Sequence, residues 1–296
     1  MFQFSNLIIE TVAANQSGAM KVRNHFKRVP AIIIGIVFSL NGYAQTNCDE
    51  YKMPKQSSSA NLANYRMIID FKRRDLNGRL NVHDIISGKI IQLSQQSVTD
   101  NAFQLADVSV TGISEQGQNK QKIDELDGLN FKIQGDNFTH LDFYKDFPPA
   151  HVERIRTFIQ DKVTFEARGL MYLDSLRLNI PFYPFLFQNQ QADFEQSVNF
   201  NTQKLNITWS GYSKINGKDC ILVYFKSMYS PFLVDNDNMI VNGRSCFWGN
   251  IWILPNTRQI EYATMNEDIV SHMKLKGIDF EQHFNIQREL TYEKIE

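Results

Sequence analysis

The chain has few cysteines, and they follow no known binding pattern. Its 296 residues include 3 cysteines, at positions Cys48, Cys220 and Cys246. An odd number excludes a closed disulfide framework. The sequence also has no Cys-x-x-Cys pair and no combined cysteine and histidine spacing of the kind that binds zinc.

Motifs that identify common enzymes are missing as well. There is no Gly-x-Ser-x-Gly nucleophile turn and no His-Glu-x-x-His metal motif. Of the 6 histidines, the five that follow the apolar run Val29–Leu40 lie far apart in the sequence, at His83, His140, His151, His272 and His283. Asp235–Asn238 is rich in oxygen ligands, but Ile240 and Cys246 occupy the glycine and glutamate positions of a calcium loop. We therefore predict no catalytic residue, no metal site and no cofactor, and we favour a function other than catalysis.

Neither sign of charge is in excess. The chain has 31 Lys and Arg residues against 32 Asp and Glu residues. A nucleic-acid surface needs Lys and Arg clustered on one face. The densest cluster, Lys72-Arg73-Arg74, lies at the end of an expected strand, where charged side chains are usually solvated. We predict no nucleic-acid partner.

No apolar run is long enough to cross a bilayer as a helix. The longest, Val29–Leu40, has about 12 residues, whereas about 20 are needed. It follows a basic stretch, Met20–Arg28, and precedes the small residues Gly42 and Ala44. This order is typical of a secretory signal peptide that is cleaved after Ala44. The alternative is a buried core helix of the same length.

The signal peptide suggests how the chain is organised. Residues 1–19 precede the basic stretch and contain no Lys or Arg, so we interpret them as a gene-model extension. Residues 20–44 form the signal peptide, 45–64 a flexible lead-in and 65–296 a single β-rich domain. The residues before Cys48 do not match a lipoprotein signal. We expect an exported protein, periplasmic or extracellular, with no integral membrane span after signal removal. Association with the outer membrane stays open.

Export permits a disulfide bond. Cys220 and Cys246 lie on successive expected strands, so a Cys220–Cys246 bridge forms if the strand register places them opposite each other. The alternative is two small buried thiols.

Alternation of apolar and polar residues predicts a mostly β fold of the α+β class. In the first half, strands are expected over residues 65–74, 79–86, 89–93 and 106–113, and a hairpin over 129–133 and 138–144. Residues 115–127 read as a polar connector. In the second half, six runs joined by short turns predict a six-strand antiparallel meander. They are 205–215, 220–228, 245–254, 259–265, 269–276 and 280–295.

One stretch has helical periodicity instead. Residues 149–162 follow Pro148, and their apolar side chains Val152, Ile155 and Ile159 share one helical face. The opposite face carries Glu153, Arg154, Arg156 and Asp161. We predict one main amphipathic helix that packs on a large curved antiparallel sheet or half-barrel.

Aromatic residues provide the candidate ligand-binding positions. A segment broken by Pro181 and Pro184 cannot be a central strand. It contains Phe182, Tyr183, Phe185 and Phe187, and the C-terminal strands add Trp209 and Trp252. These six side chains could surround an apolar ligand. The alternative is ordinary core packing.

The overall pattern, mainly over Leu205–Ile295, resembles the half-barrel of exported carriers such as the lipoprotein-localisation chaperones. We therefore predict a non-catalytic cell-envelope protein that binds an apolar small molecule or an envelope protein. One alternative is an extracytoplasmic hydrolase, for example directed at glycans, with two catalytic carboxylates. Its candidates are Glu166, Asp174, Glu261 and Glu267. A second alternative is a structural subunit of a surface assembly.

Overall fold

Strands dominate the part of the chain that the structure describes. The computed structural model describes residues 53–56, 62–97, 100–184, 198–200, 205–235 and 237–296. The first half contributes β1 (Asn64–Asp75), β2 (Leu80–Ser97), β3 (Asp100–Ser114), β4 (Gly117–Lys122) and β5 (Asn130–Gln134). The second half contributes β6 (Val198–Phe200), β7 (Asn206–Ile215), β8 (Lys218–Asp235), β9 (Met239–Ile253), β10 (Ile260–Leu275) and β11 (Glu281–Ile295).

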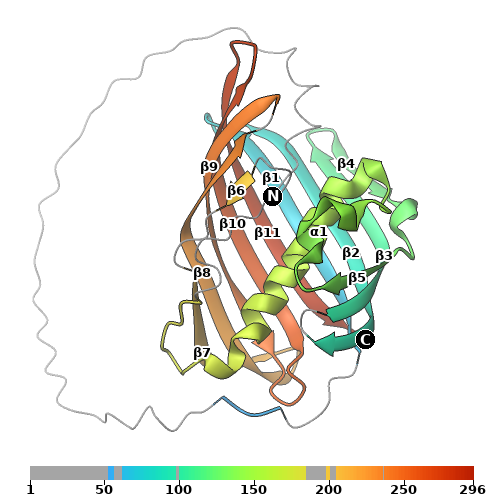
Figure 1. Cartoon of the computed structure of the whole chain (residues 1–296), viewed down its shortest axis with the longest axis vertical. Coiled ribbons are helices and arrows are strands. Elements are labelled where there is room, and N and C mark those ends of the chain that lie inside the picture. The colour runs from blue at the N-terminus through green and yellow to red at the C-terminus, as the bar shows by residue number, and fades with distance from the viewer. Residues whose placement is uncertain (1–52, 57–61, 98–99, 185–197, 201–204, 236) are drawn as a thin grey trace, which may run out of the picture. The chain divides into compact units, whose positions relative to one another are not determined.

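In the described ranges, these strands form one 11-stranded antiparallel sheet with the order β4-β3-β2-β1-β11-β10-β9-β8-β6 (Figure 1). β5 pairs with β3, and β7 pairs with β8. Neighbours in the sheet are neighbours in sequence except where β1 pairs with β11, β3 with β5 and β8 with β6. The sheet is open and curved, which confirms the predicted mostly β fold with a half-barrel.

Local sequence explains the hairpins. Asn216 and Gly217 connect β7 to β8 with φ values of 50° and 76°. Two successive residues with positive φ make the turn type whose twist matches an antiparallel hairpin, and Asn-Gly is the pair that adopts it most readily. Along β10, buried and solvent-facing side chains alternate, as the pattern predicted.

Four details of the predicted strands are wrong. The two strands predicted over residues 79–86 and 89–93 are the single strand β2. The meander has five strands, β7 to β11, because residues 259–265 and 269–276 belong to the single strand β10. Residues 115–127 contain β4, all of whose residues are exposed. Residues 138–144 form no strand, since they fold into the short 3-10 turns η3 (Asn137–Thr139) and η4 (Leu141–Tyr144).

The predicted helix is present and longer than expected. The turn η5 (Pro149–His151) leads into α1 (Val152–Glu166), and a π-helical segment, η6 (Ala167–Met171), continues it. Two further 3-10 turns are η2 (Asp124–Leu126) and η7 (Leu173–Ser175). α1 lies across one face of the sheet (Figure 1), which we call the inner face. Among the described residues, no helix is long and apolar enough to cross a membrane.

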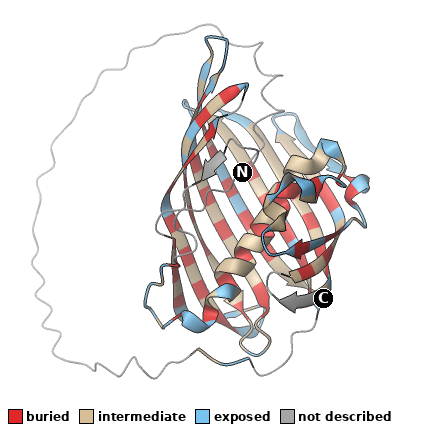
Figure 2. Ribbon diagram, in the orientation of Figure 1, coloured by how far each residue is buried: buried red, intermediate tan, exposed pale blue. Residues whose placement is uncertain are grey.

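Apolar side chains, mainly of α1 and the inner face, form what we call the core cluster. Figure 2 marks the buried positions along the ribbon in red. The largest fully buried members of the core cluster are Phe103, Phe158, Phe165, Trp209, Phe225 and Tyr292. Tyr292 stacks between Phe165 and Tyr65, with ring centroids 5.8 Å and 4.4 Å apart. These contacts bury the apolar face of the helix, which stabilises its position on the sheet.

The predicted solvent face of the helix is partly wrong. Arg156 and Asp161 are only 5% and 7% exposed. The sheet curves around α1, so both flanks of the helix meet other parts of the protein. On one flank Asp161 reaches Arg288 of β11, and on the other the Lys162 ammonium lies 3.5 Å from the Phe103 ring centroid on β3.

The predicted signal peptide, residues 20–44, lies outside the described residues, as does Cys48. The boundaries of residues 1–19, 20–44 and 45–64 therefore stay predictions.

Candidate functional site

A cluster of buried charges lies between α1 and the inner face. The Arg288 guanidinium on β11 donates from Nη1 to Glu267 Oε2 on β10 at 2.6 Å, and from Nη2 to Asp161 Oδ2 on α1. Ser245 Oγ on β9 donates to Glu267 Oε1 at 2.6 Å. With Arg168 of η6, these residues form what we call the charged cluster.

Strand register explains why the cluster forms. Glu267 and Arg288 are direct cross-strand partners, and both point to the inner face. Each therefore interrupts the apolar row of its strand at the same level. Arg288 interrupts a row that otherwise contains Phe284, Ile286 and Leu290. This interruption is visible in the sequence, but its helix partner Asp161 is not.

The two carboxyl groups respond differently to this site. Burial raises the pKa of Asp161, although Arg288 opposes the shift. Burial would also raise the pKa of Glu267, but Arg288 and the hydrogen bond from Ser245 together hold that pKa below its ordinary value. Glu267 is therefore the firmly ionised carboxylate, and Asp161 is the one whose charge is least favoured.

Arg168 is the second cation of the cluster. Its guanidinium lies over two rings, with Cζ 4.1 Å from the Phe247 centroid and 4.8 Å from the Phe225 centroid. Nη1 lies 3.2 Å from Met265 Sδ, a weak acceptor. Nε is inaccessible to solvent and has no hydrogen-bond partner, and the side chain forms no ion pair with any described residue. Arg288 is hydrogen-bonded to both Glu267 and Asp161, whereas these two carboxylates act on Arg168 only through space, where they raise its pKa against the effect of burial.

Beyond the charged cluster, most side chains of the inner face are apolar again, although Arg73, the partner of Ile286, and Asp84, the partner of Phe71, lie on the same face. We call this part of the inner face the distal sector, because it extends toward the β8–β9 and β10–β11 turns, past the part of the sheet that α1 crosses (Figure 1). Its nine apolar side chains are 0% to 9% exposed, and none belongs to the core cluster. They are Phe71, Phe232, Val234, Met239, Val241, Ile269, Met273, Phe284 and Ile286.

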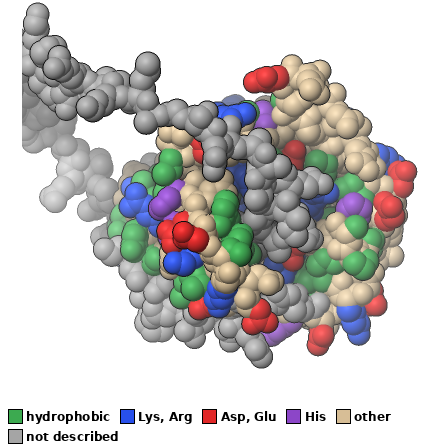
Figure 3. All heavy atoms as spheres, turned by 90° about the horizontal axis from the view of Figure 1, so that it is seen from above, with side chains coloured by type: hydrophobic (Ala, Val, Ile, Leu, Met, Phe, Trp, Pro, Cys, Tyr) green, Lys and Arg blue, Asp and Glu red, His purple; other side chains and the backbone are tan. Residues whose placement is uncertain are grey.

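Register connects the distal sector to the charged cluster. Ile269 pairs with Ser245 on one side and Ile286 on the other. Ser271, two residues along β10, is buried, and its hydroxyl has no hydrogen-bond partner among the described residues. Figure 3 shows this end of the molecule from above, where hydrophobic side chains lie beside charged ones.

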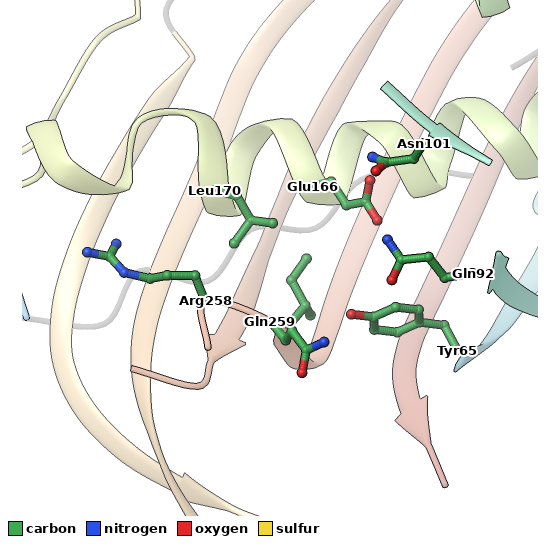
Figure 4. A pocket seen from close by; sticks show the side chains of 8 residues that line it. Tyr65, Gln92, Asn101, Glu166, Leu170, Arg258 and Gln259 are labelled. Carbon is green, nitrogen blue, oxygen red and sulfur yellow. The ribbon is translucent and has the colours of Figure 1, made fainter. Parts of the chain in front are cut away.

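A small polar pocket lies on the other flank of α1 (Figure 4). Its cavity volume is about 20 Å³, room for one or two water molecules. Its lining is Tyr65, Gln92, Asn101, Glu166, Leu170, Arg258, Gln259 and Ile260. Most of these side chains are polar, and the space is far smaller than a lipid chain needs.

The structure separates the predicted ligand-binding residues. Trp209 is fully buried in the core cluster, and its Nε1 donates to Gly211 O at 3.0 Å. Trp252 lies on the opposite face of the sheet, where its ring centroid is 5.6 Å from that of Tyr262. Phe182 packs against the core cluster, and Tyr183 is exposed. Phe185 and Phe187 lie outside the described residues.

The predicted Cys220–Cys246 bridge is not formed. Both thiols are free. Cys220 pairs with Ser213 of β7 and Cys246 with Asp268 of β10, so register keeps them apart. Cys246 Sγ instead donates to Met228 O at 2.8 Å.

Each of the four carboxylates that the sequence offers for a hydrolase is paired with a cation. The pairs are Glu166 with Lys162, Asp174 with Arg258, Glu261 with Lys218 and Glu267 with Arg288. Within the described part of the chain, no group of three or more His, Cys, Asp or Glu side chains could hold a metal ion.

No known protein family and no curated protein matches this chain. Similar solved structures include a DUF1329 family protein from Desulfovibrio piger, with 9% identity, a TM-score of 0.18, and coverage of 79% of this chain and 86% of that one. LprF from Mycobacterium bovis has 10% identity, a TM-score of 0.20, and coverage of 78% and 84%. At these scores the similarities carry no argument about function.

Proposed function

We propose that this chain is an exported binding protein of the cell envelope that holds an apolar ligand against the distal sector. The observation that supports this most is the distal sector itself. Nine apolar side chains point to the inner face, outside the cluster that packs under α1. Buried apolar side chains that do not take part in the packing under α1 are the kind of lining that an apolar ligand site needs.

Two further features fit the proposal. The signal peptide predicted over residues 20–44 would deliver the protein to the envelope. The charged cluster separates the distal sector from the core cluster, so a ligand could leave the sector without disturbing the packing under α1.

The alternatives have less support. A glycoside hydrolase needs two carboxyl groups free to exchange protons in an open cleft, and the four candidates are all paired with cations. A structural subunit would use an open sheet edge, but the edge strand β4 is polar, with Lys120 and Lys122, which discourages edge pairing.

Binding of the fluorescent probe N-phenyl-1-naphthylamine to the purified protein tests the proposal. Neighbouring residues provide matched variants, because Ile269 faces the distal sector at 1% exposure and Val270 faces outward at 43%. Ile269→Trp should fill the sector and weaken probe binding about tenfold, whereas Val270→Trp should leave it unchanged. Absence of saturable binding by the wild-type protein, or equal loss in both variants, would contradict the proposal.

A further inference from the structure

Arg168 stands out because it is a largely enclosed cation with no carboxylate of the described residues within hydrogen-bond distance, although Glu267 and Asp161 act on it electrostatically and raise its pKa against the effect of burial. Charged groups taken out of water are normally paired with an opposite charge. Arg288 meets this rule with two carboxylates, but the partners of Arg168 are two aromatic rings and a thioether. Burial lowers the pKa of Arg168 to about 10, so its guanidinium still carries a charge at neutral pH.

Arg168 also lies at the border of the distal sector. The ring of Phe247 lies beneath Arg168, and Phe247 is the cross-strand partner of Glu267. Glu267 is the residue that interrupts the apolar row of β10. The next inward-facing residue along β10 is Ile269, the first residue of the distal sector on that strand. Arg168 as a whole is half-buried, while its Nε is inaccessible to solvent and its Nη1 lies against Met265 Sδ.

From this arrangement we infer that the ligand is a single-chain amphiphile with an anionic head group, which Arg168 binds while the apolar chain lies along the distal sector. This inference rests on the proposed function and adds the ligand class. A guanidinium presents a planar fork of donors that suits a carboxylate or phosphate, and such charge-assisted hydrogen bonds are stronger than neutral ones.

The charge balance of the cluster is compatible with an added anion. Asp161 and Glu267 are both engaged by Arg288, so Arg168 is the cation of this cluster whose donors are not bound to a carboxylate of the described residues. Because burial already disfavours the charge on Asp161, this carboxyl is the group that can take up a proton when a ligand brings a further negative charge. The Ser271 hydroxyl has no partner among the described residues and offers a second polar contact within the sector.

The test compares ligands that differ only in the head group. The bound fluorescent probe is titrated separately with dodecanoate, dodecyl phosphate and dodecanol, and its displacement is measured. The pH is mildly alkaline, so that both acids are ionised. We expect the wild-type protein to bind at least one anionic ligand about tenfold more tightly than the alcohol. Preference for carboxylate or for phosphate then identifies which head group the site accepts.

Variants of Arg168 assign the preference to its side chain. Arg168→Gln should remove the preference for the anion and leave dodecanol binding unchanged, whereas Arg168→Lys should keep part of it. Arg177→Gln is the control, since Arg177 is exposed and should affect neither ligand. If Arg168→Gln does not fold, the wild-type and Arg168→Lys ratios still decide the question.

The outcomes separate the two proposals. Equal affinity of the wild-type protein for acid and alcohol, or an unchanged preference in Arg168→Gln, would overturn the role of Arg168 and leave apolar binding intact. If none of the three ligands displaces the probe and the probe itself does not bind, the proposed function fails as well.

Discussion

Arg288 of β11 and Asp161 of α1 form a buried ion pair between positions 127 residues apart in the sequence. The pair ties the helix to the strand that joins the two halves of the sheet. Because Arg288 also binds Glu267, one guanidinium compensates two buried carboxylates. The buried ion pairs between α1 and the inner face therefore depend on a single guanidinium, beside the apolar packing of the core cluster.

Removing that side chain should be costly. Arg288→Met would leave Asp161 and Glu267 without their cation, and we expect the free energy of unfolding to fall by about 3–5 kcal/mol. Lys274→Met removes an exposed ion pair with Glu281 and should cost less than about 1 kcal/mol. Urea unfolding measures both. A loss in Arg288→Met as small as that in Lys274→Met would contradict the role given to Arg288.

The two carboxyl groups should respond to pH with opposite signs. The pKa of Glu267 is held below its ordinary 4.5, so its contribution to stability is present above that pH and is lost on acidification. The pKa of Asp161 is raised above its ordinary 3.8, so the folded state takes up its proton more readily, and acidification favours folding through this group.

We therefore expect stability to fall less on acidification in Glu267→Gln than in the wild-type protein, and to fall more in Asp161→Asn. Thermal unfolding at a series of acidic pH values measures the loss of stability in each protein. All other carboxyl groups are common to the three proteins, so their contributions cancel when the profiles are compared. Identical pH profiles in the three proteins would count against these assignments.

Gly249 of β9 should not tolerate a side chain. A Cβ there would lie 2.0 Å from Thr264 O and 2.6 Å from Phe225 Cζ, and a backbone oxygen in a sheet cannot move away. Gly249→Ala should destabilise the protein by at least about 2 kcal/mol. Gly112→Ala is the control, since its nearest neighbour is 3.7 Å away, and should change stability by about 0.5 kcal/mol at most. Urea unfolding measures both variants. If they have equal free energies of unfolding, the spacing between β9 and β10 differs from the one described.

The thiols of Cys220 and Cys246 should react at different rates. Burial raises the pKa of Cys220 to about 11, and its side chain is fully buried, whereas Cys246 is partly exposed. In a Cys48→Ser background, we expect Cys246 to react with Ellman's reagent before unfolding and Cys220 only after it. A non-reduced mass two hydrogens lower than the reduced mass would instead reveal the bridge between them.

Periodicity was sufficient for the sheet and the helix but not for their details. Asn266-Glu267-Asp268 looks like a turn in the sequence, yet β10 continues through it because Glu267 finds Arg288 and Ser245 on neighbouring strands. Such compensation depends on strand register, which a local pattern does not contain. Helical periodicity likewise predicts Asp161 on the solvent face, because a local pattern does not contain the curvature of the sheet that buries this side chain.

The candidate site was less accessible to prediction than the fold. Trp209 and Trp252 both lie on C-terminal strands, but their partners Val223 and Leu222 point to opposite faces of β8. A register shift in β7 between Trp209 and Gly211 also changes which residues of that strand face inward. The sequence does not predict a role for Arg168, because a single arginine after a helix belongs to no recognisable motif. Its importance depends on the rings beneath it and on the carboxylates that bind Arg288 instead.

Native mass spectrometry of the protein purified from its exported fraction tests the central claim most directly. A denatured spectrum beside it reports the start of the mature chain and any modification of Cys48. The account predicts a chain that starts at Gln45 and, in the native spectrum, additional non-covalent mass from an apolar ligand, reduced in Ile269→Trp and retained in Val270→Trp. A ligand-free native mass for the wild-type protein, or a chain that still contains residues 20–44, would contradict it.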